Sequence, residues 1–219
     1  MQYNKNVKSM TMIAILGAII LVLGFTHIGI IHLAIIPITL LHIPVLIGSI
    51  VEGPKVGIPV ALIFGLFSFV HAIIEPSPVS FIFMNPIISI IPRIMIGIVS
   101  SYSFILFNRV IKNQTVTIGL SAFLGSVTNT ILVMGLIYIM YADNFASIFK
   151  LSQTTTSYTI LGIMLTNGLA ESLVGVIIST PISKLLMKNK RSWAVKVSSG
   201  FFYPCIISLA ISSISFARK

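Results

Sequence analysis

Six apolar runs, separated by short polar segments, follow one another along this chain of 219 residues. A helix rises about 1.5 Å per residue, so crossing a hydrocarbon layer of roughly 30 Å takes about 20 residues. Most of the runs approach or exceed that length, but the second is short and contains Pro44. The runs cover residues 10–26, 38–51, 56–74, 87–107, 117–141 and 158–187. The pattern predicts an all-α bundle of six transmembrane helices. We expect the short second helix to lie inside it, because unsatisfied backbone groups in lipid cost several kcal/mol each.

Composition supports a membrane protein. Mean hydropathy is +1.07 and only 8% of the residues are charged, so the chain has too little polar surface to cover a water-soluble core. The formal net charge of +10 could suggest nucleic-acid binding, but the basic residues stand at the edges of the apolar runs. Helix orientation and anionic lipid headgroups explain such placement. A single cysteine, Cys205, excludes an intrachain disulfide.

The basic residues predict which side of the membrane each loop occupies. In a six-helix arrangement nearly all of them fall on one side, and Lys150 alone lies among the opposite loops. By the positive-inside rule both termini are then cytoplasmic. The three outer loops cover 26–37, 75–86 and 142–157, and we expect them to form a lid, although simple connectors remain the alternative. The inner group consists of Lys5, Lys8, Lys55, Arg109, Lys112, Lys184, Lys188, Lys190 and Arg191.

The C-terminal end differs from the six runs. The apolar stretch 201–216 has 16 residues and contains Pro204 and several serines, which is marginal for spanning. We therefore expect a six-helix domain over 1–190 and an interfacial or loosely ordered tail over 191–219. A seventh helix is the alternative.

Several polar side chains lie deep within the apolar runs. Arg93 lies in the fourth run, and an arginine at the centre of a membrane helix costs about 2.5–3.5 kcal/mol on insertion scales, so it needs a partner or a wet cavity. Asn167 and Glu171, four residues apart in the sixth run, share one helix face. Asn129 lies in the middle of the fifth run. These residues predict a polar pocket for a ligand that carries a carboxylate and hydroxyl or amide groups.

Other readings of these polar residues stay open. Arg93 and Glu171 would also be explained by an internal ion pair, and the asparagines by hydrogen bonds between helices. We add Phe83 and Asn85, from the loop at 75–86, as candidate ligand contacts. The four histidines match no metal motif and are expected to be loop or interface groups: His27, His32, His42 and His71.

No sequence motif indicates an enzyme or a bound cofactor. The chain has no phosphate-binding Gly-x-x-x-x-Gly-Lys loop and no His-Glu-x-x-His pair. A solute-binding chain that cannot hydrolyse ATP takes its driving force from an ion gradient or from a partner. Ion coupling usually relies on several intramembrane carboxylates and on internal repeats. Glu171 is the only deep carboxylate and no repeat is visible, which favours a partner.

Taken together, four segments resemble the substrate-binding S components of energy-coupling factor (ECF) vitamin transporters. The resemblance extends over residues 8–190, and its most specific part is the Gly-Pro-Lys segment. The segments are Ala14-x-x-x-Ala18, His42-Ile-Pro-Val through Glu52-Gly-Pro-Lys-x-Gly57, Pro92-Arg93 and Asn167-Gly168-x-x-Glu171.

The resemblance implies a fold, a ligand and partners. Members have six helices in the bacterial plasma membrane, capture a vitamin from outside, and dock on a transmembrane T component driven by two cytoplasmic ATPases. This chain is most similar to pantothenate-type members. The resemblance assigns the docking face to Ala14 and Ala18, and small residues four apart do let helices approach closely in lipid. The alternative is that these alanines pack, with Gly17 and Gly24, against the chain's own helices.

Other functions remain open at this stage. The vitamin could instead be riboflavin, folate, cobalamin or a thiamine precursor. A stand-alone secondary carrier would share the hydropathy but would need Glu171 for proton coupling. A membrane scaffold without any solute is a third class.

Overall fold

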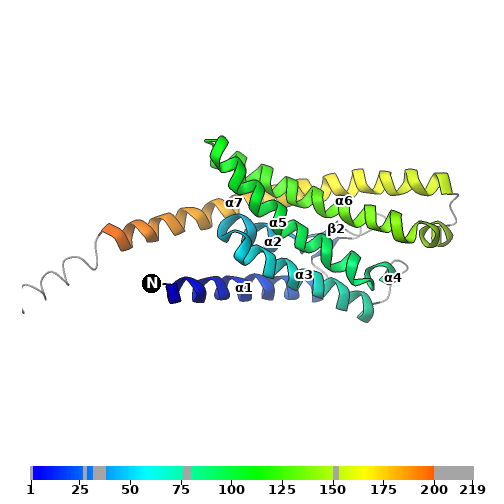
Figure 1. Ribbon diagram of the computed structural model, residues 1–219, viewed down its shortest axis with the longest axis horizontal. Helices are drawn as coiled ribbons and strands as arrows, with labels where there is room; N and C mark the ends of the chain where they lie inside the picture. Colours follow the sequence, from blue (N-terminus) through cyan, green and yellow to red (C-terminus); the bar gives the residue numbers. More distant parts are fainter. Residues whose placement is uncertain (1, 27–28, 32–37, 76–79, 150–152, 200–219) are drawn as a thin grey trace, which may run out of the picture. The chain divides into compact units, whose positions relative to one another are not determined.

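The computed structural model describes residues 2–26, 29–31, 38–75, 80–149 and 153–199, and within them the chain is almost entirely helical. Figure 1 shows the order of the elements, in which a short β-hairpin follows the first helix. The elements are α1 (Gln2–Phe25), β1 (Ile30–Ile31), β2 (Ile38–Thr39), α2 (Ile43–Glu52), α3 (Pro54–Ile74), α4 (Ser80–Phe83), α5 (Pro86–Val110), α6 (Gln114–Phe149) and α7 (Gln153–Ser199).

Five described helices are long and apolar enough to cross a membrane, which confirms a multi-pass helical membrane protein. These spans are Asn6–Phe25, Pro54–Ile74, Pro86–Val110, Gln114–Ala142 and Thr156–Asn189. The second run gives α2, which has only 10 residues and is too short to span alone. All of its residues from Ile43 to Val51 are buried, so the prediction that it lies inside the bundle is confirmed.

The Gly-Pro-Lys segment forms the turn between α2 and α3, and the conformation of this turn requires its residues. Gly53 has φ 79°, a left-handed conformation that glycine adopts without steric cost. Pro54 then begins α3, where its missing N–H is not needed. Gly57 lies against Ser49, and a Cβ at Gly57 would come 2.7 Å from the Ser49 Cα. The segment therefore folds α2 tightly back on α3.

Glycines also bring the spanning helices into direct backbone contact. A Cβ at Gly97 of α5 would lie 2.9 Å from the carbonyl oxygen of Gly57 in α3. At Gly65 the nearest atom would be the Cα of Ile90, 3.0 Å away. Such close approach is the main way helices associate where lipid removes the hydrophobic force between them. It fixes α3 and α5 as antiparallel neighbours.

The last helix extends beyond the sixth apolar run. Helix α7 reaches Ser199, so the first part of the segment expected as a tail is helical. The chain divides into two compact units, 1–183 and 184–219. Residues 200–219, where a loosely ordered tail or a seventh helix was expected, lie outside the described residues.

We predict that Gly57→Ala destabilises the protein by about 1–3 kcal/mol, because the added methyl group overlaps Ser49. Gly135→Ala is the matched control, since a Cβ there meets nothing within 4 Å and alanine is the better helix former. Thermal unfolding in detergent measures both. Equal melting temperatures for the two variants would refute the close α2–α3 contact.

Candidate functional site

Arg93 of α5 is held between two aromatic rings in the interior of the bundle. Its side chain is 6% exposed, and its Cζ lies 5.4 Å from the ring centroids of both Phe64 and Phe83. Nη1 donates a hydrogen bond of 2.8 Å to the carbonyl oxygen of Ile88. The buried Nε has no hydrogen-bond partner. Cation–π contacts stabilise the charge without using up the guanidinium donors, so donors remain for an anion.

Glu171 of α7 contacts the β-hairpin rather than Arg93. Its Oε1 accepts hydrogen bonds from the Thr39 backbone N–H at 2.8 Å and from the Thr39 hydroxyl at 3.4 Å. Arg93 and Glu171 attract each other electrostatically, but among the described residues they form no ion pair. The internal ion pair considered from the sequence is therefore absent from this structure. Arg93 keeps its charge without a directly bonded carboxylate.

The two asparagines lie at the same level of the bundle, where α6 and α7 pack antiparallel. A Cβ at Gly168 would lie 2.8 Å from Thr130 Cγ2, and a Cβ at Gly175 would lie 2.9 Å from Ser126 Oγ, so both glycines of α7 pack directly against α6. This register sets Asn129 beside the turn of α7 that carries Asn167 and Glu171. Each asparagine is 7% exposed, and the buried Oδ1 of Asn129 has no hydrogen-bond partner. An unsatisfied buried carbonyl is expensive, so this oxygen is suited to a ligand donor.

His42, expected to be a loop or interface group, belongs to this polar cluster. It is 1% exposed, and its Nδ1 lies 2.7 Å from the carbonyl oxygen of Thr39. Its buried Nε2 has no hydrogen-bond partner and faces Gly175, where a Cβ would lie 2.9 Å from it. Spacing alone could not have found this residue, because its neighbours on α7 are far away in the sequence. The sequence feature that could have indicated a buried role for His42 was its position at the start of the His-Ile-Pro-Val segment.

The two candidates from the loop at 75–86 have other contacts. Asn85 caps α5, since its Oδ1 accepts from the Ile87 N–H at 3.0 Å and its Nδ2 donates to the Tyr141 hydroxyl at 3.4 Å. Both polar atoms of this side chain are thus engaged within the protein. Phe83 supplies one of the two rings against Arg93. In this structure Asn85 fixes the start of α5, and Phe83 positions the guanidinium.

A cavity of about 300 Å³ lies between α6 and α7, on the turns that follow Asn129 and precede Asn167. Its polar groups are the hydroxyls of Tyr138 and Ser157, which lie 3.5 Å apart. The rest of its wall is apolar. The lining residues are Met134, Gly135, Tyr138, Ser157, Ile160, Leu161 and Met164.

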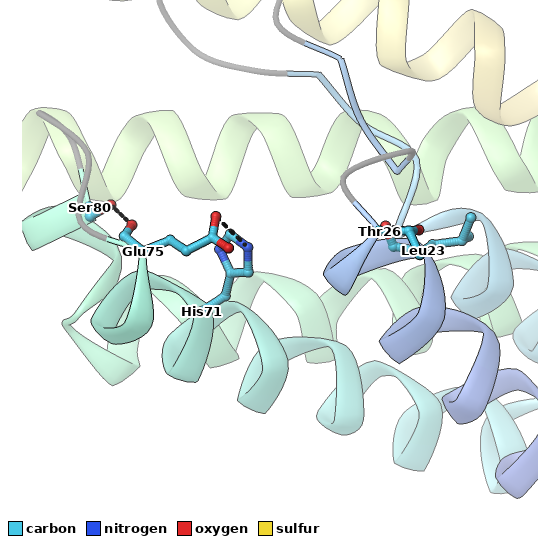
Figure 2. Close-up of polar contacts among 5 residues, drawn as sticks. All are labelled: Leu23, Thr26, His71, Glu75 and Ser80. Carbon is cyan, nitrogen blue, oxygen red and sulfur yellow. Dashed lines mark hydrogen bonds and ion pairs between the residues drawn. The ribbon is translucent and has the colours of Figure 1, made fainter.

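Short-range polar contacts lie at the C-terminal end of α3 and at the start of α4. Figure 2 shows His71 Nε2 at 3.4 Å from Glu75 Oε2 and the Ser80 hydroxyl donating to the Glu75 carbonyl oxygen at 3.1 Å. It also shows the Thr26 hydroxyl bonded to the carbonyl oxygen of Leu23, at 3.4 Å, near the end of α1. Within the described part of the chain, no group of histidine, cysteine and acidic side chains could hold a metal ion.

Helix α1 separates its small residues between two faces. Gly17 packs against Ile63, since a Cβ at Gly17 would lie 2.9 Å from Ile63 Cδ1, and Gly24 packs against Phe67. Ala14 and Ala18 are exposed. The glycines therefore follow the alternative in which small residues pack inside the chain, and the alanines do not. Ile15, Ile19 and Val22 are also exposed, so α1 has an apolar outer face that includes the two alanines.

Comparison with known proteins gives two matches. The family described as "ECF transporter, substrate-specific component" matches residues 8–183. The pantothenic acid transporter PanT of Lactococcus lactis subsp. cremoris (strain MG1363) is 35% identical over 166 residues, which cover 69% of this chain and 79% of that protein.

We predict that two asparagines of this region respond oppositely to leucine. Asn85→Leu removes the cap of α5 and lowers the free energy of unfolding by about 1 kcal/mol. Asn129→Leu removes an unpartnered buried carbonyl, whose burial costs about 1–3 kcal/mol, and leaves stability unchanged or higher. Thermal unfolding without ligand measures both. A large loss of stability in Asn129→Leu would contradict a binding role for this side chain.

Proposed function

Because the chain belongs to the family of substrate-specific components of ECF transporters, we propose that it binds pantothenate in the membrane and delivers it to the shared transport machinery. The observation that carries this proposal is the buried guanidinium of Arg93, which no carboxylate of the described chain pairs with directly. An arginine in the bundle interior without a bonded carboxylate is suited to the carboxylate of a small acid.

The proposed ligand pose follows from the chemistry of pantothenate. The carboxylate lies on the Arg93 guanidinium, and a hydroxyl or amide N–H donates to the Asn129 Oδ1. Met134 follows Asn129 by five residues, which is about 7.5 Å along the helix, so the cavity between α6 and α7 is within reach of a short elongated molecule. We assign the less polar end of the vitamin to that cavity. Asn167 and Phe83 complete the wall of the site.

The proposed topology has six membrane helices, counting the short α2, with both termini in the cytoplasm of a bacterial cell. Lys8 Nζ lies 4.0 Å from Glu52 Oε1, so the start of α1 and the α2–α3 turn lie on the same side. Lys55, Arg109 and Lys112 stand at helix ends on that side, as the positive-inside rule requires. The loops that follow α1, α3 and α6 then face outward and close over the ligand.

The proposed partners are a transmembrane T component and two cytoplasmic ATPases, which supply the driving force. The docking face is the exposed side of α1 at Ala14 and Ala18, where small side chains admit a partner helix closely. The loaded subunit turns within the membrane and releases the vitamin inward.

The competing function is a stand-alone carrier driven by protons through Glu171. The hydrogen bonds that Thr39 donates to this carboxylate favour a structural role over proton transfer. A protonophore would stop uptake by such a carrier, whereas the ATP-driven complex in reconstituted vesicles continues to transport.

We predict that Arg93→Ala weakens pantothenate binding by at least about thirtyfold, because removal of one partner of a buried charged contact costs about 2–5 kcal/mol. Arg109→Ala is the matched control, since that arginine is exposed at the end of α5. Equilibrium binding to the purified subunits measures the effect, and thermal unfolding checks that both variants are folded. Unchanged affinity in folded Arg93→Ala would refute the site.

We predict that Ala14→Trp leaves pantothenate binding intact and abolishes uptake, because the indole ring blocks close approach of a partner helix. Leu66→Trp, on an exposed position of α3, is the control and keeps uptake. Uptake by cells and binding by purified protein are measured side by side. Normal uptake by Ala14→Trp would exclude this face as the docking surface.

A further inference from the structure

The cavity between α6 and α7 has its polar groups at one end. These groups are the hydroxyls of Tyr138 and Ser157, which lie 3.5 Å apart. Tyr138 lies close to the end of the α6 span at Ala142, and Ser157 is the second residue of the α7 span, which begins at Thr156. Both residues therefore lie near the same surface of the membrane, at the depth where tyrosine is enriched and where lipids carry their polar groups.

The apolar part of the cavity extends from these hydroxyls toward the centre of the membrane. Met164 follows Ser157 by seven residues on α7, which is about 10.5 Å along the helix, and Met134 precedes Tyr138 by four residues on α6, which is about 6 Å. The hydrocarbon layer is about 30 Å thick, so one leaflet contributes about 15 Å. The cavity thus lies within one leaflet, with its polar end at the interface and its apolar end at the depth of the acyl chains.

The cavity has a buried wall and an exposed mouth. Met134 and Ile160 form part of the wall and belong to a buried apolar cluster. Tyr138 and Leu161 also line the cavity, but they are 49% and 50% exposed. The exposed side of a membrane span contacts lipid, so the cavity opens toward acyl chains. Gly135 keeps it wide, because a Cβ at this position would meet nothing within 4 Å.

From this geometry we propose that the cavity of the ligand-free subunit binds one acyl chain of a membrane phospholipid, with the ester oxygens of the lipid at Tyr138 and Ser157. The two hydroxyls are donors that ester oxygens can accept from. An apolar cavity does not hold water, whereas a hydrocarbon chain supplies the dispersion contacts that its wall offers. The flexible side chains of Met134 and Met164 can adapt to such a chain.

The consequence for transport rests on the proposed function. The proposed pose assigns the less polar end of pantothenate to the same cavity, so the vitamin and the acyl chain exclude each other. Pantothenate must then displace a lipid when it binds. Its apparent affinity falls in proportion to the fraction of subunits whose cavity is free, as for any protein in which only part of the population can bind.

The first test needs no vitamin. The purified subunit is reconstituted with a phosphatidylglycerol that carries a diazirine midway along one acyl chain. After illumination, cross-links are assigned to residues by fragmentation of peptides in a mass spectrometer. We expect labelling of Met134 and Met164 to exceed that of Ile131 and Leu165 at least about fivefold. The second pair is exposed at similar depth and does not line the cavity. Equal labelling of the two pairs would overturn the lipid site.

A matched pair of variants separates the cavity from the general lipid surface. Gly135→Leu fills the cavity and is expected to remove the excess labelling. Gly162→Leu makes the same change at an exposed glycine of α7 that does not line the cavity and where a Cβ meets nothing within 4 Å, so it keeps the excess. Thermal unfolding in detergent checks that both are folded. Excess labelling that persists in folded Gly135→Leu would contradict the proposal, and the wild-type pattern decides if this variant does not fold.

The second test adds saturating pantothenate to the same vesicles. We expect labelling of Met134 and Met164 to fall to the level of Ile131 and Leu165, which themselves stay unchanged. If pantothenate binds and the excess labelling persists, the vitamin does not displace the lipid and that consequence is refuted. If the wild-type subunit does not bind pantothenate at all, the proposed function fails, and the cross-links formed without vitamin still decide on the lipid site.

Discussion

The structure depends on the burial of one guanidinium in a bundle that lies in lipid. A membrane offers no water to solvate Arg93, so the protein must supply the surroundings that stabilise its charge. It does so with the faces of Phe64 in α3 and Phe83 in α4, and with the carbonyl oxygen of Ile88 in α5 itself. None of these groups carries a negative charge. An anionic ligand therefore adds a direct ion pair, whereas Glu171 attracts Arg93 only from a distance.

Close helix packing makes this arrangement rigid enough to be useful. Glycines let α3 and α5 meet at their backbones, and the tight α2–α3 turn buries a helix too short to span by itself. With little apolar driving force available between helices in lipid, these contacts fix the position of α5, which carries Arg93. The small residues of α1 are likewise divided between two faces. Gly17 and Gly24 pack against α3 of the same chain, whereas Ala14 and Ala18 face outward.

Much of this organisation could be predicted from the sequence, because hydrophobic run length and buried polar residues report directly on a membrane environment. Arg93, Asn129, Asn167 and Glu171 were singled out for that reason, and the structure brings them to one region. The partner of Glu171 could not be predicted, since Thr39 lies 132 residues away in the sequence. It also belongs to a strand of only two residues, which no sequence pattern indicates. The capping role of Asn85 could not be predicted either, because it depends on where α5 begins.

The most direct measurement compares pantothenate with pantothenol, the neutral alcohol that keeps the amide and both hydroxyls but lacks the carboxylate. Equilibrium binding of each compound to the purified subunit isolates the contribution of the buried guanidinium. The account predicts that pantothenate binds at least about thirtyfold more tightly and that Arg93→Ala abolishes this preference. Equal affinity of the wild-type subunit for the acid and the alcohol would contradict it.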